Sequence, residues 1–150
     1  GHAQGSFPQI TADNLNGTSF TFPAQLPADP TIVFIAYKQR QQDDINAWVA
    51  QMGLQERGGR AWIEMPVVGQ GAALMRSFID NGMRSGIQSP AIRDKTFTIY
   101  SSRRQFNRAL GISSNNQIYV ALVGQDGTVF ALVSGEVTAA KISELLSAYP

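Results

Sequence analysis

Hydrophobic positions along the chain follow two different periods, and the change from one to the other separates strands from helices. Residues 31–37 form an unbroken apolar and β-branched run, which is typical of a central strand covered on both faces. Residues 45–52 then place apolar side chains at i, i+3, i+4 and i+7, which predicts a helix with Asp43 and Asp44 near its start and Gly53 at its end. The first unit is therefore a strand followed by a helix.

The alternation of strand and helix continues through the middle of the chain. In the third predicted strand, Phe97 and Ile99 fall on one face because side chains alternate along a strand. Gly111 closes the helix that follows. The predicted elements are a strand at 61–68, a helix at 72–83, a strand at 96–100 and a short helix at 103–110.

The two ends of the chain each carry a predicted hairpin. Near the N-terminus, Asn16-Gly17 supplies the positive φ angles of a tight turn between residues 7–10 and 19–23. Near the C-terminus, the turn at 125–127 separates apolar runs at 118–123 and 128–134. A final helix follows Gly135. Its predicted apolar stripe contains Ile142, Leu145, Leu146 and Tyr149.

This order of elements predicts an α/β fold with a mixed central sheet flanked by helices and an N-terminal β-hairpin extension. The early β–α–β units need right-handed crossovers, and the late hairpin adds antiparallel strands to the same sheet. We expect one domain over residues 6–150, because 150 residues with 43% hydrophobic composition suit a single core.

The amino-acid composition limits the classes of partner and the types of reaction that we expect for this protein. The formal charge of +1 gives no electrostatic reason to expect nucleic acid, and no apolar run approaches the roughly 20 residues of a membrane span. The single histidine, His2, lies in a stretch typical of a cloning remnant. The rest of the chain has no histidine, which excludes Ser–His catalysis and histidine metal sites, so we expect no metal and no cofactor.

The first residues predict an exported protein. Residues 1–5 are expected to be a disordered tag and mature N-terminus, because Ala3-Gln4 suits the end left by signal-peptide removal. A periplasmic location follows as an expectation. The chain has no cysteine, so its stability rests on the core and not on disulfides.

The order of elements resembles the thioredoxin-like superfamily in its peroxiredoxin-like form. Residues 119–135 resemble that family's final hairpin, in which a buried strand meets an Asp-Gly turn and a glycine precedes the last helix. Within the superfamily, the chain is similar to the mitochondrial ATP synthase assembly-factor family. The similar parts are residues 7–8, 15–17 and 97–111, the strand that leads to Trp48, and the final hairpin. That resemblance implies a thiol-free assembly role with a membrane-protein partner.

Both halves of the redox site that the resemblance implies are missing. Arg40 and Asp43 stand about where thioredoxins keep two cysteines, and the thiolate is the nucleophile of that family. Thioredoxins also have a cis-proline before the hairpin strand, whereas this chain has Asn116-Gln117 before Ile118. A trans bond is expected there, because a cis bond to a non-proline residue costs roughly 3–4 kcal/mol. Disulfide exchange and peroxidase chemistry are thereby excluded.

The acidic pair Asp43 and Asp44 has two interpretations. They could form a carboxylate pair that acts in acid–base catalysis or binds a hard cation. At the start of a helix, however, we expect their carboxylates to cap free N–H groups and to interact favourably with the positive end of the helix dipole. Lys38 and Arg40 beside them complete a mixed-charge rim over residues 38–44.

A glycine-rich segment and a basic segment are the remaining candidates. Residues 69–74 follow a strand as a dinucleotide motif would, but Leu74 replaces its third glycine, so an ordinary helix start is expected. Residues 76–108 contain seven basic and two acidic residues, a net charge of +5. They could bind an anionic partner or simply form solvated faces whose arginine stems cover apolar surface.

We therefore expect a non-catalytic, chaperone-like binding or assembly module, with a protein or peptide partner that can be a membrane protein. The alternatives are a thiol-independent enzyme, or a small-molecule or lipid binder, at the 38–44 rim. The candidate binding residues are Lys38, Arg40, Asp43, Asp44, Asn116, Gln117, Arg103, Arg104 and Arg108.

Overall fold

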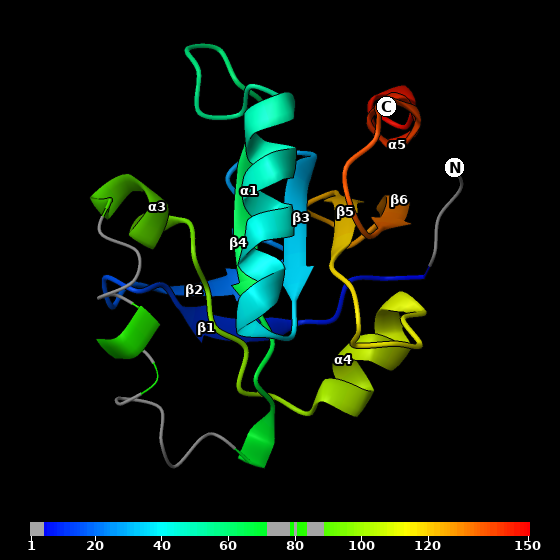
Figure 1. The fold of residues 1–150 in the computed structure, drawn as a ribbon. Helices are drawn as coiled ribbons and strands as arrows, with labels where there is room; N and C mark the ends of the chain where they lie inside the picture. The colour runs from blue at the N-terminus through cyan, green and yellow to red at the C-terminus, as the bar shows by residue number, and fades with distance from the viewer. Residues whose placement is uncertain (1–4, 72–78, 80, 84–88) are drawn as a thin grey trace.

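A mixed four-stranded sheet forms the centre of the molecule (Figure 1). The computed structural model describes residues 5–71, 79, 81–83 and 89–150. Within the sheet the strand order is β4-β3-β5-β6, with β3 and β4 parallel and the other neighbours antiparallel. The sequence analysis predicted all four strands of this sheet, with bounds within two residues of those observed. They are β3 (Thr31–Ala36), β4 (Trp62–Pro66), β5 (Tyr119–Val123) and β6 (Val129–Ser134).

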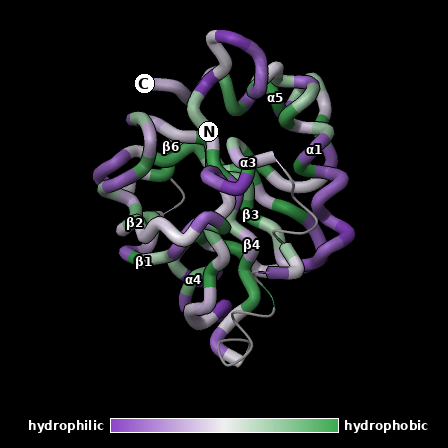
Figure 2. The backbone as a smooth tube through the Cα atoms, turned by 90° about the vertical axis from the view of Figure 1, so that its left-hand side faces the viewer, coloured by the Kyte–Doolittle hydropathy of each residue, from purple (hydrophilic) through white to green (hydrophobic). Residues whose placement is uncertain are grey.

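The central strand β3 is buried along its whole length because its alternate side chains enter two separate cores. Val33 and Ile35 point to one face of the sheet, and Ile32 and Phe34 point to the other. Figure 2 shows β3 and β4 as hydrophobic segments. The unbroken apolar run of this strand thus follows from cover on both faces.

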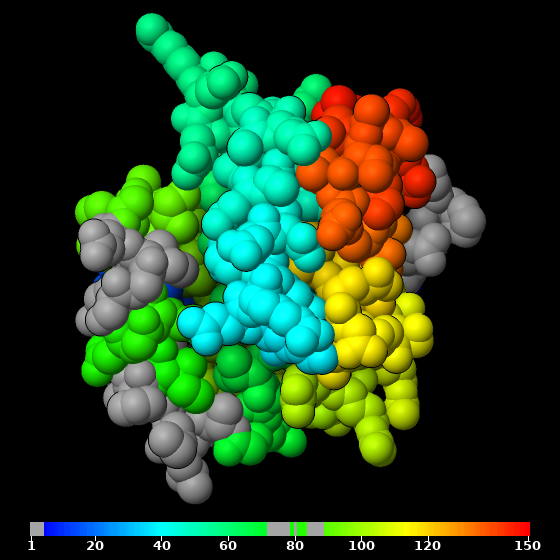
Figure 3. Space-filling view, viewed as in Figure 1, coloured from blue at the N-terminus to red at the C-terminus, as the bar shows by residue number. Residues whose placement is uncertain are grey.

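Two helices cover one face of the sheet. α1 (Gln42–Gln51), preceded by the 3-10 helix η1 (Gln39–Gln41), lies beside α5 (Ala139–Ser147) (Figures 1 and 3). Trp48 anchors α1: its ring is fully buried, and its Nε1 donates to the carbonyl oxygen of Gly135 at 3.0 Å. Both tryptophans, Trp48 and Trp62, are core residues, as expected.

The N-terminal hairpin and α4 cover the other face. β1 (Ile10–Asp13) pairs antiparallel with β2 (Ser19–Phe22), which confirms the predicted extension. α4 (Arg103–Leu110) ends at Gly111, whose φ of +73° suits glycine. Phe22 packs edge-to-face on Phe97, with ring centroids 4.8 Å apart.

The segment predicted as a third strand is not a continuous strand. It forms only isolated bridges: parallel ones from Thr96 to Glu64 and from Ile99 to Val67, and an antiparallel one from Phe97 to Asn14. Phe97 and Ile99 do share one face, since both are buried in the same core. The segment is short because the preceding helix, α3 (Pro90–Asp94), runs almost directly into it. The sequence analysis missed α3, although a proline at its first position is a helix-start signal.

Two other helix predictions need comment. In α5, Leu145 is fully buried, but Leu146 is 37% exposed, so its place in the apolar stripe was wrong. The face of α5 that packs on the sheet is narrower than the predicted apolar stripe, and Leu146 lies at the edge of that face. The predicted helix over 72–83 lies mostly outside the described residues; Ile79 and residues 81–83 are helical.

Candidate functional site

The junction between β3 and α1, where thioredoxins keep their thiols, is organised by the buried side chain of Gln41. Its Oε1 accepts hydrogen bonds from the backbone N–H groups of Tyr37 and Lys38, at 2.7 and 3.2 Å. Its Nε2 donates to the carbonyl oxygen of Asn115 at 3.0 Å. Gln41 is 3% exposed, so these bonds satisfy the polar atoms of its own buried amide.

The same network continues through α4 and closes on itself. The Tyr37 hydroxyl donates to Asn107 Oδ1 at 2.5 Å, and Asn107 Nδ2 donates to Asn115 Oδ1 at 2.9 Å. Burial raises the pKa of Tyr37 above its ordinary value, Tyr119 adds to that increase, and the charge of Arg103 opposes it. The phenol therefore stays neutral and acts as a hydrogen-bond donor. The junction holds paired amides and a neutral phenol in place of a reactive group.

Removing the Tyr37 hydroxyl tests how much this network contributes. Tyr37→Phe is expected to lower the free energy of unfolding by about 1 kcal/mol, because Asn107 loses its donor. Tyr119→Phe is the matched control, since the Tyr119 ring is buried 6.4 Å from that of Tyr37 and its side chain takes no part in the bonds that join Tyr37, Asn107 and Asn115. Urea denaturation measures both. Equal stability losses in the two variants would contradict the assignment.

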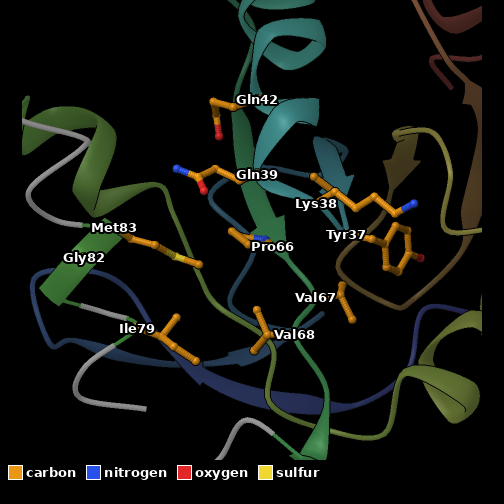
Figure 4. A pocket seen from close by; sticks show the side chains of 11 residues that line it. Tyr37, Lys38, Gln39, Gln42, Pro66, Val67, Val68, Ile79, Gly82 and Met83 are labelled. Atoms are coloured by element: carbon orange, nitrogen blue, oxygen red, sulfur yellow. The ribbon is translucent and has the colours of Figure 1, made fainter. Parts of the chain in front are cut away.

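A cleft of about 600 Å³ opens beside this junction, at the carboxyl ends of the parallel strands β3 and β4 (Figure 4). Ligands of open α/β sheets bind at such strand ends. Figure 4 shows Val67 and Val68 on the strand side and Ile79 and Met83 opposite Lys38. The described residues that line it are Ala36, Tyr37, Lys38, Gln39, Gln42, Pro66, Val67, Val68, Ile79, Gly82 and Met83.

Of the predicted 38–44 rim, the described cleft lining includes Lys38 and not Arg40, Asp43 or Asp44. Arg40 and Asp43 are exposed, and Asp44 is half-buried. The enzymatic alternative requires one of these aspartates to share a pocket with Lys38 or Arg40, and the described lining lacks that arrangement. Within the described residues, the cleft thus takes Lys38, Gln39 and Gln42 from the rim and neither aspartate.

The expected capping role of Asp43 and Asp44 was wrong in detail. The residue before α1 is Gln41, and its side chain makes no cap. Both aspartates lie inside the first turn of α1, where their charge favours the positive end of the helix dipole without a cap hydrogen bond. The physical reason is register: a cap side chain must precede the helix.

Asn116 and Gln117, the pair at the place of the family's proline, have different surroundings. Asn116 Oδ1 accepts from Lys38 Nζ at 2.8 Å, which joins two of the predicted site residues. Gln117 Oε1 lies 3.3 Å from the position that a Cβ on Gly135 would take, so this side chain lies over Gly135. The bond between Gln117 and Ile118 is trans, as expected.

The described members of the basic segment form two groups at opposite sides of the molecule in Figure 1. Beside α3, Arg93 Nε donates to Asn16 Oδ1, and Lys95 Nζ lies 5.4 Å from the Trp62 ring centroid. Arg76 and Arg84 lie outside the described residues. On α4, the exposed arginines are Arg103, Arg104 and Arg108.

Sequence reasoning missed one buried carboxyl group, that of Glu64. It is 2% exposed in β4, and its Oε1 accepts from Gln42 Nε2 at 2.9 Å. Its Oε2 lies 3.1 Å from Thr96 Oγ1. Desolvation raises the pKa of Glu64, and these two hydrogen bonds work against the increase. An acid inside an apolar strand was the signal that could have identified it.

Comparison with known proteins gives a fold and no family. No family model matches the chain, and no curated protein matches it by sequence. Three solved structures illustrate the likeness. A proposed electron transfer protein from Aquifex aeolicus VF5 has a TM-score of 0.65 at 12% identity, over 97% of this chain and 93% of that one. BsSco, a member of the Sco family of cytochrome c oxidase assembly proteins, has 0.64 at 12%, over 97% and 94%. The exposed lipoprotein thioredoxin of Streptococcus pneumoniae TIGR4 has 0.63 at 9%, over 93% and 98%.

The chain therefore has a thioredoxin-like fold: a mixed four-stranded sheet flanked by helices, with an N-terminal antiparallel hairpin. It has no cysteine, so it cannot carry the thiol chemistry of disulfide exchange. Among the described helices, none is long and apolar enough to cross a bilayer. Over residues 5–71, 79, 81–83 and 89–150, no three side chains of His, Cys, Asp or Glu gather as metal ligands would.

Proposed function

We propose that this protein is a non-catalytic, thioredoxin-like binding module that holds an extended segment of a partner protein in the cleft at the ends of β3 and β4. One observation carries the proposal. An apolar cleft opens beside the junction where thioredoxins carry out chemistry, while the polar network of the junction consists of mutually paired amides and a neutral phenol. The site thus keeps a place to bind and lacks the thiols of that chemistry.

The cleft suits a peptide because its wall and floor differ in chemistry. Val68 is half-buried and offers apolar surface for side chains, while Val67 beneath it is fully buried. Gln39 has an exposed amide at the opposite wall, which can pair with the backbone of an extended chain. Main-chain hydrogen bonds with pockets for alternate side chains are a recurring mode of peptide recognition.

An assembly role in an exported setting completes the proposal. BsSco, which shares the fold, belongs to a family of cytochrome c oxidase assembly proteins, and another structural neighbour is an exposed lipoprotein. The resemblance to the mitochondrial ATP synthase assembly-factor family points in the same direction, toward a membrane-protein partner.

A charge introduced at Val68, on the strand side of the cleft, tests the proposal. Val68→Asp is expected to weaken binding of peptides selected from a random displayed library at least tenfold, because it places a charge where apolar side chains pack. Leu146→Asp is the matched control, since Leu146 is an exposed apolar residue on α5, away from the cleft. Fluorescence anisotropy measures both. Failure to select any peptide that Val68→Asp weakens would refute the peptide role.

A small-molecule or lipid ligand is the second candidate. The volume of about 600 Å³ and the mostly apolar lining favour it, because sites for such ligands have about 300–1,000 Å³ and few polar groups. Native mass spectrometry of the protein purified from its source would show a co-purified molecule, and Val68→Asp would release it.

A further inference from the structure

Two cationic side chains flank Tyr37, one of the residues that line the cleft. Lys38 follows Tyr37 in the chain, and Figure 4 shows its side chain running alongside the phenol ring. Arg103 approaches from α4: its Nε lies 3.1 Å from the position that a Cβ on Gly69 would take, directly after the cleft residue Val68. The charge of Arg103 also acts on the Tyr37 phenol. Lys38 thus lines the cleft, and Arg103, from a distant part of the sequence, lies at its edge beside Val68.

Neither cation is neutralised by a carboxylate within the described part of the chain. Lys38 Nζ donates to Asn116 Oδ1, an uncharged amide oxygen, at 2.8 Å. Arg103 is exposed at the start of α4, and its stem packs over Gly69. The described cleft lining contains no acidic residue. This edge of the cleft therefore offers positive potential to a ligand, next to an apolar floor.

We propose that the cleft binds peptide segments in which an acidic side chain stands next to an apolar one, with the carboxylate between Lys38 and Arg103 and the apolar side chain on Val68. This inference rests on the proposed function and names the class of peptide. Arg103 can pair with a carboxylate through two parallel N–H groups, and Lys38 adds a mobile point charge. Complementary charge fixes the orientation in which the segment lies and excludes basic sequences.

Selection from a random heptapeptide display library tests the inference. The wild-type protein is expected to enrich Asp or Glu within two residues of a large apolar residue. The double variant Lys38→Glu/Arg103→Glu is expected to lose this preference and to bind the selected peptides at least about tenfold more weakly. Arg104→Glu is the matched control, because Arg104 is exposed on the same helix and does not contact Gly69. All three substituted side chains are exposed, and circular dichroism checks that the variants fold.

The outcomes separate this inference from the function beneath it. Selected peptides that Val68→Asp weakens, but that show no acidic preference, would overturn the inference and leave the binding function standing. A library that yields no cleft-dependent peptide would overturn both. Sedimentation with phosphatidylglycerol vesicles is the last arm. Vesicle binding that the double variant abolishes, together with no acidic preference among peptides, would assign the two cations to a lipid surface and so contradict the inference.

Discussion

Gln41→Ala is expected to lower the free energy of unfolding by about 3 kcal/mol, because three backbone groups lose a hydrogen bond to one buried side chain at once. The N–H groups of Tyr37 and Lys38 lose their acceptor, and the carbonyl of Asn115 loses a donor. Each unsatisfied buried group costs on the order of 1 kcal/mol or more. Urea denaturation followed by circular dichroism gives the number.

Gln39→Ala is the control for this experiment. Gln39 has the same side chain, two residues away, but is exposed, so its loss is expected to change stability by less than about 0.5 kcal/mol. A loss below 1 kcal/mol for Gln41→Ala would show that water replaces the amide and that the junction is not organised as described. Gln41→Ala is also expected to weaken peptide binding, because the backbone that carries Lys38 loses its support.

Glu64→Gln is expected to stabilise the protein increasingly as the pH rises above about 4.5. The pKa of Glu64 is raised from 4.5 in the folded state, chiefly by desolvation, so the folded protein holds this proton more tightly than the unfolded chain does. The stability of the wild-type protein therefore falls as the pH rises from 4.5 through the folded-state pKa, by up to about 1.4 kcal/mol per pH unit. Glutamine cannot ionise, so the variant avoids this loss.

The hydrogen bonds to Glu64 offset only part of its desolvation. The Thr96 hydroxyl has one hydrogen, which it shares between the carbonyl oxygen of Ile92 at 2.8 Å and Glu64 Oε2 at 3.1 Å, so its bond to the carboxylate is weaker than an undivided one. Among the described residues, the side chains that hydrogen-bond to Glu64 are uncharged: Gln42 from α1 and Thr96. The ammonium of Lys95 lies over the Trp62 ring.

Unfolding curves at pH 4, 5, 6, 7 and 8 check this prediction. The wild type and Glu64→Gln should have equal stability near pH 4 and diverge as the pH rises. Glu144→Gln serves as the control, because Glu144 is exposed on α5 and its substitution should shift stability by the same small amount at every pH. Parallel curves for wild type and Glu64→Gln would rule out a proton held by Glu64. Since Gln42 lines the cleft and donates to Glu64, the same titration is expected to change the affinity for cleft peptides.

The fold could be predicted from the sequence to the extent that side-chain periodicity is a local property. The strand at 31–37 and the final hairpin could be identified from their own residues alone. A strand buried on both faces is apolar throughout, and a strand buried on one face alternates, so either pattern is visible in consecutive residues. The segment 96–100 was harder, since a few bridges to β4 leave a weaker pattern than a full ladder. The prediction that Leu146 is buried was wrong for a related reason: apolar periodicity shows which side of a helix faces the core, but not how wide the buried face is.

The candidate site was harder to predict than the fold. Lys38 and Arg103 were both identified as candidate binding residues, but on separate surfaces, and only the approach of α4 to Gly69 brings Arg103 to the edge of the cleft that Lys38 lines. Gln41 has no feature in the sequence that distinguishes it from Gln39 or Gln42. Its burial depends on Asn115, 74 residues further along the chain.

By itself, the sequence determined the order of strands and helices and the loss of thiol chemistry, because hydrophobic periodicity and the absence of cysteine are both properties of the linear chain. Only the tertiary structure decided what stands at the junction: a closed network of Tyr37, Gln41, Asn107 and Asn115 with an apolar cleft beside it. The physical reason is that apolar burial leaves a periodic record in neighbouring residues, whereas a polar side chain becomes a buried partner or a surface group according to what the rest of the fold brings against it.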